Sequence, residues 1–210
     1  MKMFIVLTMA PIFFLACAGQ KPLPQPVSIA DPGLASALAA AGLPADQLTT
    51  TALHRLQRLD ASGRNIGSLS GIEYCSELIE LDLSNNNIED IGPLAALRGL
   101  AILNLSSNRI SDIGPLSRLY RLNLLYLQAN RISDISALSL NMDGGGFPPQ
   151  SWIHLEQNPL GDKAMNVDIP YLVTEGVTIT FTKNNMQTTR RPVRPSVAMD
   201  SRLPQWRPLP

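Results

Sequence analysis

The chain has 210 residues, and its 17 basic and 17 acidic side chains give a formal net charge of zero. This balance gives no overall indication of nucleic-acid binding, for which an excess of lysine and arginine is typical. The length suits one domain of moderate size with tails at its ends.

The chain begins with a predicted secretory signal, residues 1–16. Lys2 precedes an apolar run from Phe4 to Ala16, which is too short to span a bilayer comfortably. The run ends in FLAC, and a small residue before cysteine resembles a bacterial lipobox. The resemblance implies that Cys17 is lipidated and becomes the new N-terminus. The alternative is an ordinary signal cut near Ala16 or Ala18, with Cys17 incidental.

The residues around the cysteine carry two further expectations. By the same resemblance, Ala18 favours delivery to the outer membrane, because an aspartate at this position signals retention in the inner membrane. If Cys17 is lipidated, no intrachain disulfide bond is possible, and the place of Cys75 in the first repeat predicts a buried structural thiol. Residues 17–26 form a proline-rich tether that is not expected to pack.

A helical cap is predicted over residues 27–55. Asp31 is the expected N-cap of a helix that runs to Leu43, with Pro32 at the first helical position. One face of this helix carries Leu34, Ala37, Leu38 and Ala41. A second short helix near residues 51–56 leads into the next segment. Such a cap shields the apolar side chains that follow it from water.

Five repeats are predicted over residues 56–161, from the pattern L-x-x-L-x-L-x-x-N-x-I. Three copies follow one another at a spacing of 22 residues: Leu78, Leu81, Leu83, Asn86 and Ile88; Leu100, Leu103, Leu105, Asn108 and Ile110; Leu122, Leu125, Leu127, Asn130 and Ile132. The first copy is weaker, with Leu56, Leu59, Ala61 and Ile66, and Arg64 in place of asparagine. The last copy, with Ile153, Leu155, Asn158 and Leu160, is displaced by 28 residues. The six extra residues are placed at 144–149 as a flexible, glycine-rich insertion.

Each L-x-L alternation predicts a short strand with one buried face, which ends at the following asparagine. The asparagine amide both donates and accepts, so we expect a ladder of Asn86, Asn108, Asn130 and Asn158 to satisfy backbone groups in the turns. No single copy can bury its leucines alone. The copies must therefore stack, with their strands in one parallel sheet.

The three LxxLxLxxNxIxDI copies and the lead-in SGRNIGSLSGIEYC resemble bacterial leucine-rich repeats of the 22-residue, internalin-like type. The resemblance covers about residues 27–162. It implies an α/β repeat solenoid, a short horseshoe with a parallel sheet on the concave face and an N-terminal helical cap. Internalin-like proteins, by the same resemblance, serve adhesion or the binding of host proteins.

Three columns of side chains are predicted on the concave face. The first contains Arg58, Glu80, Ile102, Leu124 and Trp152; the second contains Asp60, Asp82, Asn104, Tyr126 and His154; the third contains Ser62, Ser84, Ser106, Gln128 and Glu156. Apolar and aromatic residues gather on the late coils, and an exposed cluster of this kind often marks a binding site. The predicted ligand-binding residues are Arg58, Glu80, Asp82, Ile102, Asn104, Leu124, Tyr126, Trp152 and His154. One alternative is that the insertion or the C-terminal segment covers this end, with Trp152 as ordinary core. Another is that the register of the last repeat differs from the one assigned.

Two segments follow the repeats. Residues 162–187 are predicted to close the solenoid, because VTITF at Val177–Phe181 alternates like a strand. Residues 188–210 are basic and rich in proline, and we expect them to be disordered. Their charged residues are Arg190, Arg191, Arg194, Arg202 and Arg207 against Asp200. The alternative is a segment that docks on an anionic surface such as lipopolysaccharide, cell-wall polymer or an acidic protein.

No catalytic, metal or cofactor motif is predicted. His54, His154 and Cys75 lie several coils apart, and the three glycines at 144–146 lack the lysine and hydroxyl residue of a phosphate loop. The acids Asp90, Asp112 and Asp134 recur at the repeat spacing. They permit a calcium ladder, but hydrogen bonds to nearby backbone N–H groups in turns are the favoured interpretation.

The sequence therefore predicts a non-enzymatic, monomeric protein-binding module, lipid-anchored at the bacterial outer membrane, that does not bind nucleic acid. The alternative is a structural envelope protein whose basic tail contacts cell wall or lipopolysaccharide. The two hypotheses differ in which substitutions reduce binding, those of Tyr126 and Trp152 or those of the tail arginines.

Overall fold

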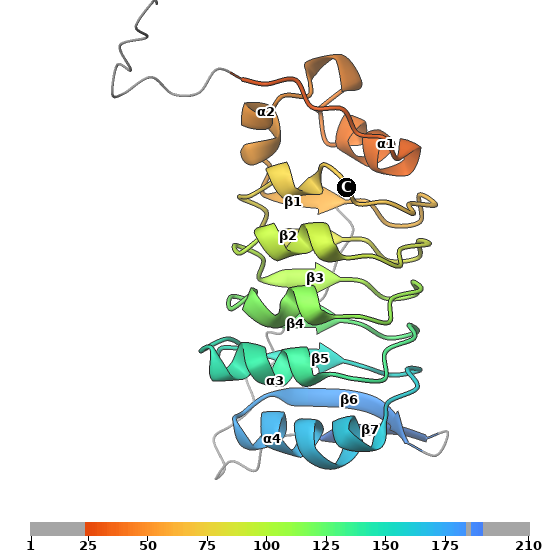
Figure 1. Cartoon of the computed structure of the whole chain (residues 1–210), viewed down its shortest axis with the longest axis vertical. Helices are drawn as coiled ribbons and strands as arrows, with labels where there is room; N and C mark the ends of the chain where they lie inside the picture. The colour runs from red at the N-terminus through yellow and green to blue at the C-terminus, as the bar shows by residue number, and fades with distance from the viewer. Residues whose placement is uncertain (1–23, 184–185, 191–210) are drawn as a thin grey trace, which may run out of the picture.

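The computed structural model describes residues 24–183 and 186–190, which form a stack of coils beneath a helical cap (Figure 1). The predicted signal, the lipidation at Cys17, most of the tether and residues 191–210 lie outside the described residues.

Seven strands form one sheet, in the order of the chain. They are β1 (Arg58–Asp60), β2 (Glu80–Asp82), β3 (Ile102–Asn104), β4 (Leu124–Tyr126), β5 (Trp152–His154), β6 (Thr178–Lys183) and β7 (Met186–Arg190). The first six strands are parallel, and β7 runs antiparallel to β6. This arrangement confirms the predicted solenoid and adds a sixth parallel strand.

The strand register follows the repeat. The central positions of successive strands pair in turn, through Leu59, Leu81, Leu103, Leu125, Ile153 and Ile179. Each of these side chains is at most 1% exposed. Burying a leucine or isoleucine side chain contributes about 1.5–3 kcal/mol to the stability of the fold. The apolar side chains of each coil pack against those of the next coil. The stack therefore has a single continuous core.

Short helices form the return side of the coils, in front of the sheet in Figure 1. They are η2 (Ile72–Tyr74), η3 (Gly92–Ala96), η4 (Gly114–Arg118), α3 (Ser136–Asp143), η5 (Ala164–Asp168) and α4 (Ile169–Thr174). The Oδ1 atoms of Asp90 and Asp112 each accept a hydrogen bond of 2.7 Å, from the backbone N–H of Gly92 and Gly114. Asp134 accepts from the N–H of Ser136 at 2.7 Å in the same way. The recurring acids thus have the predicted turn chemistry.

The asparagine ladder ties each coil to the one before it. Asn108 Oδ1 accepts from Ile88 N at 3.0 Å, while its Nδ2 donates to Leu83 O at 2.9 Å and Leu105 O at 3.1 Å. The same pattern recurs at Asn86, Asn130 and Asn158. All four side chains are at most 9% exposed. Each amide therefore satisfies buried backbone groups in two neighbouring coils, as the repeat predicts.

The insertion before β5 differs from the flexible segment that its glycines predict. The helix α3 replaces the shorter 3-10 helices of the earlier coils, and Asn141 Nδ2 donates to Leu116 O at 2.7 Å. Phe147, inside GGGFPP, is 3% exposed and belongs to the core. Its apolar ring anchors residues 144–149 against the stack.

The cap begins with α1 (Pro32–Ala40), followed by η1 (Ala45–Gln47) and α2 (Thr50–His54). Asp31 is the N-cap: its Oδ1 accepts from Leu34 N at 3.0 Å. Its Oδ2 accepts from Gly67 N at 2.9 Å and from Ser68 N at 3.0 Å, which joins the cap to the first coil. Leu34, Ala37 and Leu38 are buried as predicted, but Ala41 is the exposed C-cap because the helix ends before it.

The end of the predicted tether packs against this cap. Pro26 forms an isolated antiparallel bridge with Thr49, and Val27 N donates to Leu48 O at 3.0 Å. Thr50 N donates to Gln25 O at 2.9 Å. Residues 25 and 26 therefore belong to the folded domain, in contrast to the boundary drawn from their proline content.

The C-terminal segment closes the stack, as predicted. The core side of β6 carries Ile179 and Phe181, and both are 0% exposed. Strand β7 includes residues 188–190, so the end of the folded domain lies beyond the predicted boundary. The Arg190 guanidinium lies 5.8 Å from the centroid of the Phe181 ring and covers this end of the core. Within the described residues, no helix is both long and apolar enough to cross a membrane.

Candidate ligand-binding site

The concave face is the sheet face that points away from the helices, and the strand register places its side chains in columns. The first column runs Arg58, Glu80, Ile102, Leu124, Trp152 and Thr178; the second runs Asp60, Asp82, Asn104, Tyr126, His154 and Thr180. Successive members lie on adjacent strands, about 4.8 Å apart. The nine predicted ligand-binding residues therefore share one continuous surface.

Three rings form an aromatic cluster, Tyr126, Trp152 and His154. The Tyr126 and His154 rings are stacked, with centroids 4.7 Å apart and planes 8° apart. The Trp152 ring lies 6.0 Å from the His154 ring, at 18° to it. All three side chains are half-buried. Because each ring packs on its neighbour, the cluster is largely preformed.

His154 is held in place by hydrogen bonding beneath the cluster. Its Nδ1 lies 2.9 Å from Thr180 Oγ1 and 3.7 Å from Glu156 Oε1. Burial acts to raise the pKa of Glu156, but hydrogen bonds from His154 and Thr180 outweigh it and lower that pKa to about 2. Glu156 is therefore ionised at neutral pH, and a fixed negative charge borders the aromatic cluster.

The early coils present acids. Asp82 Oδ1 accepts from Ser84 N at 2.8 Å, and its Oδ2 accepts from Asn104 Nδ2 at 3.1 Å. Burial raises the pKa of Asp82, and repulsion from Asp60 adds to this rise. Asp60 itself accepts from the N–H and the hydroxyl of Ser62. These hydrogen bonds fix the positions of the two carboxylates on the concave face.

The apolar pair between the two ends is less accessible than its position predicts. Ile102 is half-buried and Leu124 is only 7% exposed. Leu124 lies between Ile102 and Trp152 in the first column. Leu124 therefore supports Trp152 from the side and offers little contact area of its own.

The face also contains two residues that the repeat pattern did not predict, Thr178 and Thr180 of β6. Both lie in the columns, at 6% exposure, and Thr180 orients His154. The sequence held a signal for them, because Ile179, Phe181 and Asn184 have the spacing of Leu81, Leu83 and Asn86. Aromatic and β-branched replacements of leucine hid this sixth copy.

Within residues 24–183 and 186–190, His54 and Cys75 do not form a second candidate site. His54 Nδ1 lies 2.6 Å from the Oγ of Ser76, which follows Cys75 in the first coil. His54 and Cys75 are therefore closer together than the predicted separation of several coils. Cys75 is buried, and burial raises the pKa of its thiol to about 12, as expected for a structural thiol. In the described part of the chain, no group of three or more His, Cys, Asp or Glu side chains is placed to hold a metal ion.

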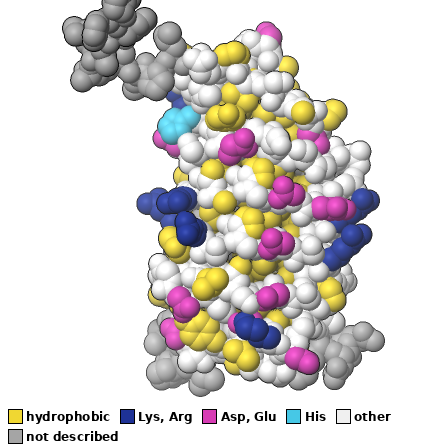
Figure 2. Space-filling view, viewed as in Figure 1, with side chains coloured by type: hydrophobic (Ala, Val, Ile, Leu, Met, Phe, Trp, Pro, Cys, Tyr) yellow, Lys and Arg dark blue, Asp and Glu magenta, His cyan; other side chains and the backbone are white. Residues whose placement is uncertain are grey.

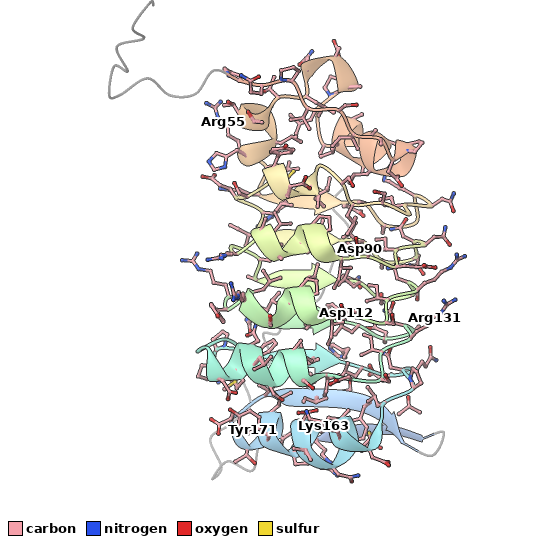
Figure 3. The ribbon with its side chains drawn as sticks, in the orientation of Figure 1. Arg55, Asp90, Asp112, Arg131, Lys163 and Tyr171 are labelled. Atoms are coloured by element: carbon pink, nitrogen blue, oxygen red, sulfur yellow. The ribbon has the colours of Figure 1, made fainter. Side chains whose placement is uncertain are left out.

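The helical face, opposite the concave face, carries charged side chains that take part in structural hydrogen bonds. In Figure 2, acidic side chains follow one another down its middle, and most basic side chains gather at its edges. Asp90 and Asp112 lie at equivalent places in neighbouring coils (Figure 3). Near the last coil, Lys163 Nζ donates to both carboxylate oxygens of Asp168, at 2.8 and 2.9 Å. These groups stabilise the coils and leave the aromatic cluster as the more distinctive surface.

Comparisons with known proteins agree with this architecture. Residues 54–96 and 98–140 match the family described as leucine-rich repeats, two copies. An internalin from Listeria monocytogenes, InlF, is similar in structure, with 27% identity and a TM-score of 0.60 over 75% of this chain and 54% of that chain. This chain thus spans about half the length of that internalin. No curated protein matches the sequence.

Two further structures show a weaker similarity. Internalin C2 of Listeria monocytogenes is 23% identical, with a TM-score of 0.38 over 79% of this chain and 100% of that chain. The functional domain of InlJ from the same organism is 19% identical, with a TM-score of 0.36 over 65% of this chain and 39% of that chain. The repeat match and the stacked parallel sheet together show that the chain carries leucine-rich repeats and has an internalin-like solenoid fold.

Proposed function

We propose that this chain is a non-enzymatic protein-binding module of the bacterial envelope, which binds its ligand on the concave face. The observation that carries this proposal is the aromatic cluster, in which the stacked rings of Tyr126 and His154 lie 4.7 Å apart on a regular sheet. Aromatic side chains that are half-buried and packed in advance are typical anchors of protein interfaces.

The surroundings of the cluster favour a protein ligand over a small molecule. The face is an extended surface of six adjacent strands, with the aromatic rings and Glu156 at one end and the other carboxylates at the opposite end. Stacking and the hydrogen bond to Thr180 hold the His154 ring before a ligand arrives. A preformed surface loses little side-chain entropy on binding, which leaves more of the contact energy for affinity.

Lipidation of Cys17 is the second part of the proposal. It rests on the apolar run before FLAC and on the proline-rich residues after it. The tether ends where Pro26 pairs with Thr49, at the capped end of the stack and far along the sheet from the aromatic cluster. An acyl anchor at this end would leave the ligand-binding end directed away from the membrane.

The anchor is tested by metabolic labelling with an alkyne-bearing fatty acid. We expect the parent chain to be labelled and to fractionate with the outer membrane, and the Cys17→Ser chain to lose both properties. Label that persists in the Cys17→Ser chain would contradict lipidation at this residue.

The binding site is tested by quantitative capture from envelope and host-cell extracts. Three baits are compared: the parent chain, Tyr126→Ala/Trp152→Ala, and the control Tyr74→Ala/Tyr120→Ala, whose tyrosines are 44% and 42% exposed outside the strands. Circular dichroism verifies that all three are folded. We expect a protein that is captured by the parent and the control and lost from the concave-face variant.

The alternative of a structural envelope protein makes the opposite prediction. If purified cell wall or lipopolysaccharide is retained equally by the parent and the concave-face variant, but not by a chain whose tail arginines are replaced, the repeats serve as a spacer. A hydrolytic activity abolished by one conservative substitution would contradict both non-enzymatic hypotheses.

A further inference from the structure

The concave face has a marked excess of negative charge. The three columns contain four carboxylates, those of Asp60, Glu80, Asp82 and Glu156, against one guanidinium, that of Arg58. Asp82 is only 2% exposed, so the carboxylates that a partner can contact are those of Asp60, Glu80 and Glu156. Arg58 is already paired, since its Nη2 lies 3.3 Å from Glu80 Oε1. Carboxylates held on one low-dielectric surface favour a cationic partner, because each lowers the energy of a positive charge placed above the sheet.

The chain leaves the described domain beside this face. In the β6–β7 pair, Thr189 lies opposite Thr180 and Arg190 lies opposite Ile179. On β6, the residue before Ile179 is Thr178, which lies in the row of Trp152. The last described residue of the chain is therefore one position away from that row. The sequence that follows contains Pro192 and Pro195, which have no N–H to donate to a strand ladder.

The sequence beyond β7 complements the face in charge. Residues 191–210 contain four arginines and one acid, Asp200, together with five prolines. Arginine is suited to the task, because its planar guanidinium both pairs with carboxylates and stacks on aromatic rings. Trp206 and two leucines, Leu203 and Leu209, add apolar contacts of the kind that Ile102 and the aromatic cluster accept.

The length of the segment is sufficient to cover the face. An extended chain spans about 3.3 Å per residue, or about 66 Å for this segment. From β7 to β1 there are six strand spacings of about 4.8 Å, or about 29 Å. Arg194 can therefore reach the coil of Glu156, and Arg202 can reach the coil of Asp82, without displacing β7.

We propose that residues 191–210 dock across the concave face of their own chain, with their arginines beside its carboxylates and their apolar residues against the aromatic cluster. The tail is then an intramolecular occupant of the surface, and a protein ligand must displace it. The charge of the face, the length of residues 191–210 and the position of the end of β7 all favour this docking, whether or not the face also binds a protein ligand.

The test is photo-crosslinking from the face in the full chain. Tyr126 is replaced by p-benzoylphenylalanine, the chain is irradiated at low micromolar concentration, and the crosslinked peptides are identified by mass spectrometry. We expect crosslinks within one chain to residues 191–210. In 1 M salt, where the Debye length falls to about 3 Å, the yield should fall several-fold.

Two variants with the same change in charge sharpen the result. In one, Arg191, Arg194, Arg202 and Arg207 are all replaced by serine; in the other, the exposed Arg109, Arg118, Arg121 and Arg131 are replaced. We expect the first to reduce the crosslink yield at least five-fold and the second to leave it unchanged. A labelled peptide of residues 188–210 should bind the first variant at least ten-fold more tightly than the parent, because its face is free.

Three results would overturn the proposal. These are the absence of crosslinks to residues 191–210, an equal yield in both variants, and crosslinks only between two chains with a yield that rises with concentration. Circular dichroism of each variant excludes loss of the fold as their cause. A failed capture of a protein ligand would not change this outcome, so the two proposals are tested separately.

Discussion

Replacing the ladder asparagines by alanine should destabilise the chain in a graded order that the hydrogen bonds set. In Asn108→Ala, the three carbonyls that Nδ2 contacts keep another donor: Asn86 still bonds Leu83 O, Asn130 still bonds Leu105 O, and Asn85 N still bonds Ser106 O. Only the N–H of Ile88 loses its partner. One buried and unpaired N–H costs about 1–3 kcal/mol, so we expect a loss of about 2 kcal/mol.

Asn86→Ala should cost about twice as much. Asn86 Oδ1 accepts from two backbone groups, Arg64 N at 3.0 Å and Ile66 N at 2.9 Å, and its Nδ2 donates to Ala61 O at 2.9 Å. Because Arg64 stands where the first coil would have its own asparagine, no neighbouring amide takes over these groups. With two to three groups unpaired at about 1–3 kcal/mol each, we expect a loss of about 4 kcal/mol.

The assay is urea unfolding followed by circular dichroism, with the free energy of unfolding taken from the midpoint and slope. Asn87→Ala is the control, because that side chain bonds only the exposed Asn65 side chain, and we expect a change within about 0.5 kcal/mol. Equal losses for Asn86→Ala and Asn108→Ala, or losses near that of the control, would refute the assignment of stability to individual backbone groups.

Three further predictions follow from local geometry. Ala129 has a φ of 56°, a left-handed conformation that costs a residue with a Cβ about 1–2 kcal/mol. Glycine avoids this cost but loses more backbone entropy on folding, so Ala129→Gly should raise the free energy of unfolding by roughly 0.5–1 kcal/mol. The same urea assay measures this change, and a lower stability would contradict the prediction. The folded-state pKa of Glu156 is lowered from 4.5 to about 2, so its contribution to stability is present above about pH 4.5 and is lost as the pH falls toward 2. Glu156→Gln should flatten this part of the stability-against-pH curve, and an unchanged curve would show that the carboxylate is not held as described. Because the pKa of Cys75 is raised to about 12 and the thiol is buried, iodoacetamide at pH 8 should alkylate it only in urea; rapid alkylation of the folded chain would contradict its burial.

The repeat pattern predicts most of the fold because its physics is local and periodic. Leu81 and Leu83 require a neighbour on each side, and Asn86 requires backbone groups at a fixed place in the preceding coil. Those requirements specify the stack, the register and the columns without any alignment. Burial of Leu81 and the five hydrogen bonds of Asn86 bear this out.

The structure of the two ends and of the insertion does not follow from the repeat, so the sequence predicted it less well. Glycines around Phe147 indicate a flexible loop, but the burial of a single ring outweighs their backbone freedom. Prolines near Pro26 indicate a tether, yet the backbone groups of Gln25 find partners in the cap. Such non-local contacts are not encoded in a period, since they depend on which surface happens to lie within reach.

The sequence predicts which residues line the candidate site, but it does not predict how exposed each side chain is. Alternation places Leu124 and Trp152 side by side, but only packing shows that Leu124 is covered while Trp152 stays half-buried. The support of His154 by Thr180 depends on a strand that lacks the leucine pattern. The chemistry of the aromatic cluster therefore emerges only when the sixth strand is in place.

The central claim is that the aromatic cluster binds a protein ligand. The most direct measurement is hydroxyl-radical footprinting, with and without the captured partner, of the chain whose four tail arginines are replaced by serine. We expect protection of Tyr126 and Trp152, with Tyr74 and Tyr120 unchanged. Protection of Tyr74 or Tyr120 with no change at Tyr126 and Trp152 would contradict the claim and move the binding site away from the concave face.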